Sequence, residues 1–242
     1  MKTYISLCLL FFLTICVTTV KGQESDSIQK VREQNRKGWN NTLIKSKGFT
    51  RERNSFLKEA IRNLPPGKAL DVAMGEGRNT LLLARNGWET TGFDIADVAM
   101  DSAKARAARE NLKIITVVAS RDEFDFGTEK WDLIAVIYSD IVCGGCCAYD
   151  QAFIATIKRA LKPGGRIVYE WFTREGLLEV QPVVKEKGNE SWGCKENTIR
   201  DAFLNIGGFE IIHYSEELGI PDWDPSLKFE PIKLVYFIGQ KK

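Results

Sequence analysis

Short apolar runs and stretches with apolar residues at helical spacing alternate along residues 54–242. The runs have the length and β-branched content of buried strands, and the stretches between them are amphipathic. This alternation is typical of an α/β domain with a doubly wound, mostly parallel sheet and helices on both faces. The predicted strands are 68–73, 88–93, 112–119, 131–137, 166–172, 209–215 and 233–240, and the predicted helices are 54–64, 79–86, 96–111, 149–161 and 195–206.

The N-terminal part has a different pattern. Residues 1–22 combine a basic start at Lys2, an apolar core at 5–17 and a small or polar end at Gly22, which predicts a signal peptide and therefore an exported, secreted or periplasmic protein. An uncleaved membrane anchor is the alternative, although the apolar core is shorter than the roughly 20 residues of a spanning helix. Residues 23–64 are predicted to be N-terminal helices, and residues 65–242 the main domain.

The balance of basic and acidic residues narrows the classes of binding partner that we expect. Residues 1–22 hold two lysines and no acid, so residues 23–242 carry 32 basic and 32 acidic side chains. A neutral domain offers no electrostatic reason to expect nucleic acid or an acidic membrane surface as a partner. No further segment is apolar enough to span a membrane, so we expect no stable span once the signal is removed.

The most informative stretch runs from Lys68 to Asp94 and predicts strand, glycine turn, helix, strand and a final acid. Gly75 and Gly77 lack a Cβ, so a ligand can approach the turn closely. Asp94 ends the second strand, where a carboxylate can accept hydrogen bonds from both hydroxyls of a ribose. A dinucleotide site would have a third glycine at Thr80, and Glu76 would repel a pyrophosphate. These features favour a ligand with a cationic amino-acid moiety over a nicotinamide dinucleotide.

The run Asp71-Val72-Ala73-Met74-Gly75-Glu76-Gly77 resembles motif I of class I S-adenosylmethionine (SAM) dependent methyltransferases, and 160–166 resembles their loop before strand five. The resemblance covers roughly residues 54–242 and is strongest to the tellurite-resistance-like, small-molecule branch. It implies a seven-stranded sheet with an antiparallel last strand, SAM as cofactor, and N-terminal helices that are either a candidate lid or a plain amphipathic cover. Ala73 departs from the motif, because it replaces the first glycine.

Carried over residue by residue, the resemblance gives each position of the cofactor site a role. Asp71 would orient the turn and reach the ammonium group of the donor, and the backbone at Ala73, Gly75 and Gly77 would line methionine and ribose. Asp94 would hold the ribose hydroxyls. The predicted cofactor-binding residues are Asp71, Ala73, Gly75, Gly77, Asp94, Ile95, which would pack on adenine, and Asp122, which would touch its amino group or else be a solvated loop acid.

Residues 138–149 follow the fourth strand and are predicted to face the acceptor. Asp140 is a candidate for the general base, or else a helix cap, and we predict no resident metal site. Cys143, Cys146, Cys147 and Cys194 are compatible with a disulfide involving Cys194, with binding of a soft metal or metalloid, or with plain small residues. Glu170 faces either the substrate pocket or an outer basic residue.

We therefore predict an enzyme, a SAM-dependent methyltransferase acting on a small-molecule hydroxyl, thiol or metalloid. Its alternative is an exported, non-catalytic SAM-binding domain, because SAM is made in the cytoplasm and Ala73 departs from the motif. His213 is the only histidine and lies inside a predicted strand, which makes a histidine-based hydrolase improbable.

Overall fold

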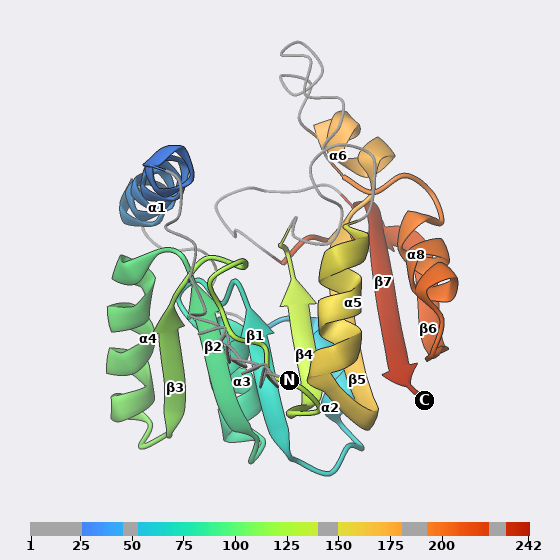
Figure 1. Cartoon of the computed structure of the whole chain (residues 1–242), viewed down its shortest axis with the longest axis horizontal. Helices are drawn as coiled ribbons and strands as arrows, with labels where there is room; N and C mark the ends of the chain where they lie inside the picture. The colour runs from blue at the N-terminus through green and yellow to red at the C-terminus, as the bar shows by residue number, and fades with distance from the viewer. Residues whose placement is uncertain (1–25, 46–52, 140–149, 181–192, 223–230) are drawn as a thin grey trace, which may run out of the picture.

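The computed structural model describes residues 26–45, 53–139, 150–180, 193–222 and 231–242. A single seven-stranded sheet forms its centre, with the strand order β3-β2-β1-β4-β5-β7-β6 (Figure 1). Strand β7 runs antiparallel to its neighbours β5 and β6, and the other neighbouring pairs are parallel. The predicted sheet is thereby confirmed. Its strands are β1 (Lys68–Val72), β2 (Glu89–Asp94), β3 (Ile114–Val118), β4 (Trp131–Ile137), β5 (Leu161–Phe172), β6 (Phe209–Gly219) and β7 (Ile232–Lys241).

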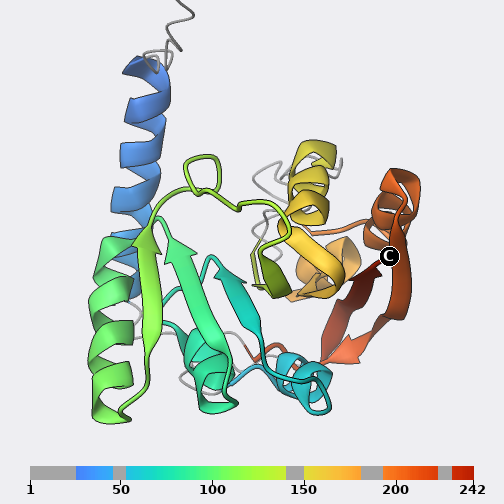
Figure 2. The same ribbon diagram turned by 60° about the horizontal axis from the view of Figure 1, so that its bottom comes forward.

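Helices cover both faces of this sheet (Figures 1 and 2). Those before β1 and after β1 and β2 lie on one face, and those after β4 and before β6 lie on the other. The N-terminal helix packs on α4 at the edge of the sheet nearest β3. The helices are α1 (Asp26–Lys45), α2 (Ser55–Ile61), α3 (Arg78–Arg85), α4 (Asp97–Arg109), α5 (Gln151–Ala160), α6 (Arg174–Val180) and α8 (Thr198–Ile206).

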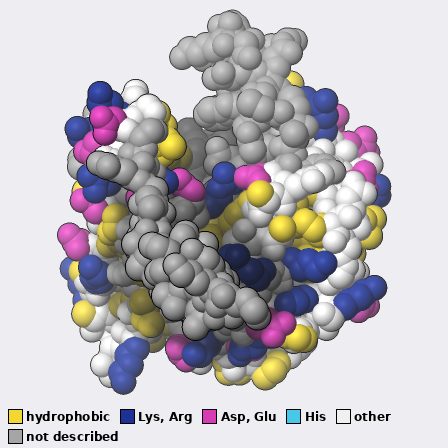
Figure 3. All heavy atoms as spheres, viewed as in Figure 1, with side chains coloured by type: hydrophobic (Ala, Val, Ile, Leu, Met, Phe, Trp, Pro, Cys, Tyr) yellow, Lys and Arg dark blue, Asp and Glu magenta, His cyan; other side chains and the backbone are white. Residues whose placement is uncertain are grey.

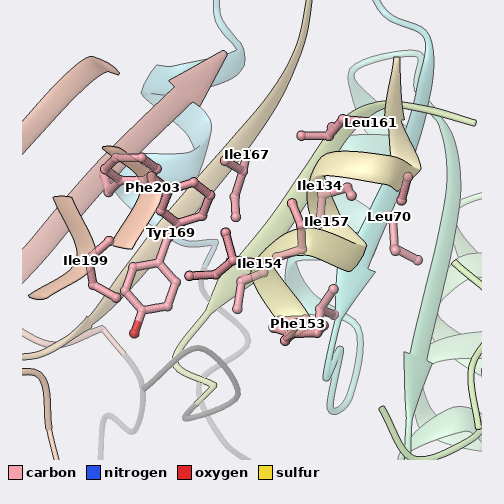
Figure 4. Packing of buried hydrophobic residues seen from close by; sticks show 14 of the residues in the cluster. Leu70, Ile134, Phe153, Ile154, Ile157, Leu161, Ile167, Tyr169, Ile199 and Phe203 are labelled. Carbon is pink, nitrogen blue, oxygen red and sulfur yellow. The ribbon is translucent and has the colours of Figure 1, made fainter. Parts of the chain in front are cut away.

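The inner strands are buried on both faces, as their continuous apolar sequence predicts. In β4, Ile134 and Val136 pack with α5 and α8, whereas Leu133 and Ala135 pack with α2 and α3. Figure 4 shows the first of these layers, in which Ile154 and other side chains of α5 fill the space over β1, β4 and β5. Neighbouring residues of one strand therefore serve two separate cores.

Two local predictions were incomplete. Strand β5 begins at Leu161, five residues before the predicted start, because the chain pairs with Trp131 before a register shift. At Gly165 an added Cβ would lie 2.9 Å from the carbonyl oxygen of Trp131, so glycine permits this close approach. Helix α6 was not among the predicted helices, since its sequence has little periodicity.

The surface in Figure 3 carries acidic and basic side chains on the same face, without a uniform sign. Within the parts of the chain that the structure describes, no helix has the length and apolar character needed to cross a membrane. The predicted signal peptide lies outside the described residues.

We predict that Gly92→Ala destabilises the domain. Gly92 lies on β2 beneath the turn, and an added Cβ would come within 2.8 Å of Thr80 Oγ and also overlap the sulfur of Met74. Overpacking of this kind costs about 1–3 kcal/mol. Urea unfolding followed by circular dichroism should show a lower midpoint. Gly38→Ala is the matched control, because Gly38 lies in α1 with nothing within 4 Å of its added Cβ and should gain about 0.5–1 kcal/mol. An unchanged midpoint for Gly92→Ala would contradict this packing.

Candidate cofactor and acceptor site

The glycine turn joins β1 to α3 through a close contact with β2. Met74 N–H donates to the carbonyl of Phe93 at 3.0 Å, and Gly77 N–H donates to the carbonyl of Met74 at 2.9 Å. Three residues of the turn have left-handed backbones, with φ of 54° at Ala73, 51° at Gly75 and 77° at Gly77. The alternating left-handed residues curl the turn around the carboxyl end of β1, beside the start of α3.

Glycine suits positions 75 and 77 of the turn for different physical reasons. At Gly77 an added Cβ would lie 2.8 Å from Cβ of Ala103 on α4, so glycine allows α3 and α4 to pack closely. At Gly75 an added Cβ would meet nothing within 4 Å. Among the described residues, open space therefore lies over Gly75, and none of them obstructs a ligand that approaches the backbone there.

Ala73 adopts a left-handed backbone conformation of the kind that glycine favours. Its φ of 54° is a left-handed value that costs an L-residue about 1–2 kcal/mol. The side chain is half-buried. The departure from the motif thus adds a methyl group and backbone strain to the turn.

Asp71 lies beneath the turn and is 2% exposed. Thr80 Oγ donates to Asp71 Oδ2 at 2.6 Å. Burial raises the pKa of Asp71 to about 6, against the hydrogen bonds from the Thr80 side chain and backbone, which lower it. The carboxylate of Asp71 thus fixes the start of α3 to β1, while its predicted contact with the donor's ammonium group stays a prediction.

Asp94 ends β2 with its carboxylate held by backbone groups. Gly75 N–H donates to one oxygen and Ala96 N–H to the other, both at 2.8 Å. Burial raises the pKa of Asp94, and these backbone hydrogen bonds oppose the rise. Each carboxylate oxygen has a second lone pair, so this orientation suits two neighbouring ribose hydroxyls. Ile95 follows directly and is half-buried, as a residue beside a ligand would be.

Asp122 and α1 lie at the β3 side of the site. The loop after β3 starts beside Asp94, since Ala119 N–H donates to the carbonyl of Asp94 at 2.9 Å. Asp122 itself binds Arg32 of α1, with 3.0 Å between Arg32 Nε and Asp122 Oδ2. The contact of Asp122 with adenine and the lid role of α1 stay predictions. The ion pair between Arg32 and Asp122 joins α1 to the loop after β3.

A second group of polar residues lies at the carboxyl ends of β4 and β5. Glu170 of β5 is 2% exposed, and its carboxylate accepts hydrogen bonds from the Tyr138 hydroxyl and from Asn54 Nδ2 at 2.8 Å. The same Asn54 amide donates to Asp222 Oδ1 at 3.2 Å. Arg78, the first residue of α3, forms an ion pair with Asp222 at 3.0 Å. We call these five residues the polar cluster.

Only one member of the polar cluster, Glu170, was visible in the sequence as a candidate. Alternation along β5 places Glu170 on the same face as Val168, which packs against α2 and α3. Asn54 and Asp222 are 168 residues apart, and no local pattern signals that they meet. In the described parts of the chain, no group of three or more His, Cys, Asp or Glu side chains is arranged to hold a metal ion.

Two other acceptor-side predictions concern Asp140 and the cysteines. Asp140, Cys143, Cys146 and Cys147 lie outside the described residues. Cys194 is buried and disulfide-bonded, with its partner outside the described residues. This agrees with the disulfide alternative for Cys194.

Comparison with known proteins agrees with this geometry. Residues 69–165 match the family model of a methyltransferase domain. A demethylmenaquinone methyltransferase of Tropheryma whipplei is 32% identical over 101 residues, which cover 42% of this chain and 40% of the relative. The match thus spans about two fifths of the length of that curated relative.

Solved structures share the fold over most of the chain. One of them comes from work on the conversion of a disulfide bond into a thioacetal group during echinomycin biosynthesis. It has a TM-score of 0.62 at 20% identity, and the alignment covers 79% of this chain and 82% of the solved chain. Magnesium protoporphyrin IX methyltransferase of Synechocystis, solved with bound S-adenosylhomocysteine, has a TM-score of 0.55 at 17% identity and covers 91% and 89%. Residues 69–165 are therefore similar to a methyltransferase domain, and the chain shares its fold with these solved structures.

Proposed function

We propose that this protein transfers a methyl group from SAM to a small-molecule nucleophile that bears a hydroxyl, a thiol or a metalloid. The observation that carries the proposal is the carboxylate of Asp94, which two backbone N–H groups hold beside the open space over Gly75. A single carboxylate aimed beside an open glycine turn suits a nucleoside with a free ribose diol. The small-molecule, tellurite-resistance-like branch remains part of this proposal.

The protein contributes mainly binding and orientation. SAM supplies an activated methyl group on a sulfonium sulfur. Asp94 would bind the ribose, Ile95 would contact adenine, and the backbone at Ala73 and Gly75 would leave room for the remaining part of the cofactor. Fixing donor and acceptor in one geometry can supply much of the rate enhancement of such a reaction.

The acceptor would bind at the carboxyl ends of β4 and β5, where parallel sheets of this order open a crevice. The names of the two methyltransferases similar to this chain point to a quinone precursor and a porphyrin. Because these two acceptors differ so much, we infer that the residues at the ends of β4 and β5 determine which substrate this protein binds.

We predict that full-length wild type binds SAM and that Asp94→Asn binds it at least about tenfold more weakly. The substitution removes a charge and turns one backbone-accepting oxygen into a donor, a loss worth about 1.5–3 kcal/mol. Isothermal titration with SAM and with S-adenosylhomocysteine measures both affinities. Asp101→Asn is the control, because Asp101 lies on α4 with its side chain 88% exposed. Equal affinities for wild type and Asp94→Asn, or no binding by wild type, would contradict the proposed cofactor site.

A second candidate function is an exported domain that binds SAM without transferring its methyl group. The strained alanine at position 73 is the observation that favours it, since it adds a methyl group to the turn that would hold the cofactor. SAM binding without transfer to any hydroxyl, thiol or metalloid would support this alternative.

We also propose that residues 1–22 direct export and are removed. N-terminal sequencing of the protein from the extracellular or periplasmic fraction should then begin at Gln23. A chain still beginning at Met1 in the membrane fraction would indicate the anchor instead. The same chain in a cytoplasmic fraction would refute export.

A further inference from the structure

Glu170 is the most deeply buried carboxylate of the polar cluster, and its hydrogen-bonding partners are neutral. It accepts from the Tyr138 hydroxyl and from Asn54 Nδ2, while the guanidinium of Arg78 pairs with Asp222. A buried carboxylate held by neutral donors is less stabilised than one in a direct ion pair. Its proton affinity is therefore raised at the end of the sheet where the acceptor would bind.

Tyr138 is held in an uncommon backbone conformation at the end of β4. Its φ is 52°, a left-handed value that is rare for a bulky residue and costs energy. Its N–H donates to the carbonyl of Glu170 at 3.0 Å, its ring packs against Phe172 with 5.3 Å between centroids, and Arg78 lies 5.7 Å above that ring. These contacts hold the hydroxyl on Glu170. Tyr138 is half-buried, so it is the more accessible member of the pair.

We propose that Tyr138 and Glu170 form a proton relay for the methyl acceptor, and that the acceptor is consequently a protic nucleophile, a hydroxyl or a thiol. The inference rests on the proposed methyltransferase function. It places the role of general base on Glu170, where the sequence had offered only Asp140.

The acceptor oxygen or sulfur forms a bond to the methyl carbon, and the electron pair of the breaking carbon–sulfur bond stays on the donor sulfur, which becomes a neutral thioether. The acceptor's proton passes to the Tyr138 oxygen as the Tyr138 proton passes to Glu170 Oε1. Tyr138 is neutral before and after the step, and Glu170 ends as a carboxylic acid that returns its proton to solvent.

The ionisation of both groups agrees with these roles. Burial raises the pKa of Glu170 to about 7, with a further rise from Asp222 and opposing effects of Tyr138, Asn54 and Arg78. Burial and the Glu170 charge raise the pKa of Tyr138 well above its usual range, so it transmits a proton without becoming a stable anion. The remaining titratable group facing Glu170 among the described residues is Tyr236 of β7, whose pKa is also raised by burial and by Glu170. A base with a pKa near the working pH is effective in proton transfer.

The test compares Glu170→Gln and Tyr138→Phe with wild type, all as full-length chains. The matched control is Glu216→Gln, because Glu216 also accepts a hydrogen bond from a tyrosine, Tyr214, and its side chain is 8% exposed on β6, outside the polar cluster. Each protein is given SAM and one of four small probes. Phenol, catechol and benzyl mercaptan carry a proton on the nucleophilic atom, whereas dimethyl selenide carries none.

We expect wild type to methylate at least one protic probe, with kcat/KM rising as pH increases through about 7. Glu170→Gln and Tyr138→Phe should lower this rate by about 100-fold or more, and Glu170→Gln should also lose the inflection near pH 7. Their SAM affinities, measured by calorimetry, should stay within about twofold of wild type. Glu216→Gln should behave as wild type. Full activity and an unchanged pH profile in Glu170→Gln would overturn the relay.

The four probes also test whether the acceptor is a protic nucleophile. Transfer to dimethyl selenide alone would overturn the protic assignment. Failure with all four probes by a wild type that binds SAM would also overturn it, because a working relay should give at least slow transfer to a small protic nucleophile. Absence of SAM binding is a different result, since it refutes the proposed function itself.

Thermal stability provides a readout that needs no acceptor. A carboxyl whose pKa is raised in the folded state, here from 4.5 to about 7, stabilises the fold fully only below the lower value, and this contribution is lost as pH rises through the higher one. Glu170→Gln carries no such charge. Its melting temperature relative to wild type should therefore be higher at pH 8 than at pH 5. An equal difference at the two pH values would show that Glu170 does not titrate in this range and would overturn the relay.

Discussion

The glycine turn depends on a buried carboxylate in the strand that precedes it. Helix α3 has glycine at its N-cap position, which offers no side chain to the free N–H groups of the first turn. Asp71 replaces the missing cap from β1, because its carboxylate accepts hydrogen bonds from the hydroxyl and the backbone of Thr80. An anion at a helix N-terminus is favourable, which offsets part of the cost of burying it. The cap also explains why Thr80 stands where a dinucleotide site has glycine.

The same helix start connects the cofactor half of the site to the acceptor half. Arg78 follows Gly77 in the chain and pairs with Asp222, and Asn54 joins Asp222 to Glu170. Each carboxylate of this cluster thus has a defined donor, which is the condition under which a buried polar network stabilises a unique arrangement. A shift of α3 would therefore be felt at the end of β5, two strands away from the turn.

Sequence reasoning predicted best those features that depend on local pattern. Strand β4 was predicted with its observed bounds because WDLIAVI is apolar apart from Asp132, and Asp94 was found because it ends the strand that follows the glycine turn and its helix. The extension of β5 to Leu161 was missed because Pro163 and two glycines suggest a loop, while pairing with Trp131 overrides that preference. The polar cluster was missed because its contacts join residues from five distant parts of the chain, which alternation and spacing do not encode.

Backbone strain occurs in both halves of the site, at Ala73 on the cofactor side and at Tyr138 on the acceptor side. Ala73 and Tyr138 follow β1 and β4 directly, and both have left-handed backbones. Their strands are neighbours, so the two strained residues lie at the same edge of the sheet. At Ala73 the cost of about 1–2 kcal/mol is partly offset, because alanine has less freedom than glycine to lose on folding, a difference of about 0.4–1 kcal/mol. The departure from the motif is therefore mainly a cost in stability. At Tyr138 the same conformation directs a hydroxyl onto Glu170, where a strand continuing in the extended conformation would have directed its side chain elsewhere.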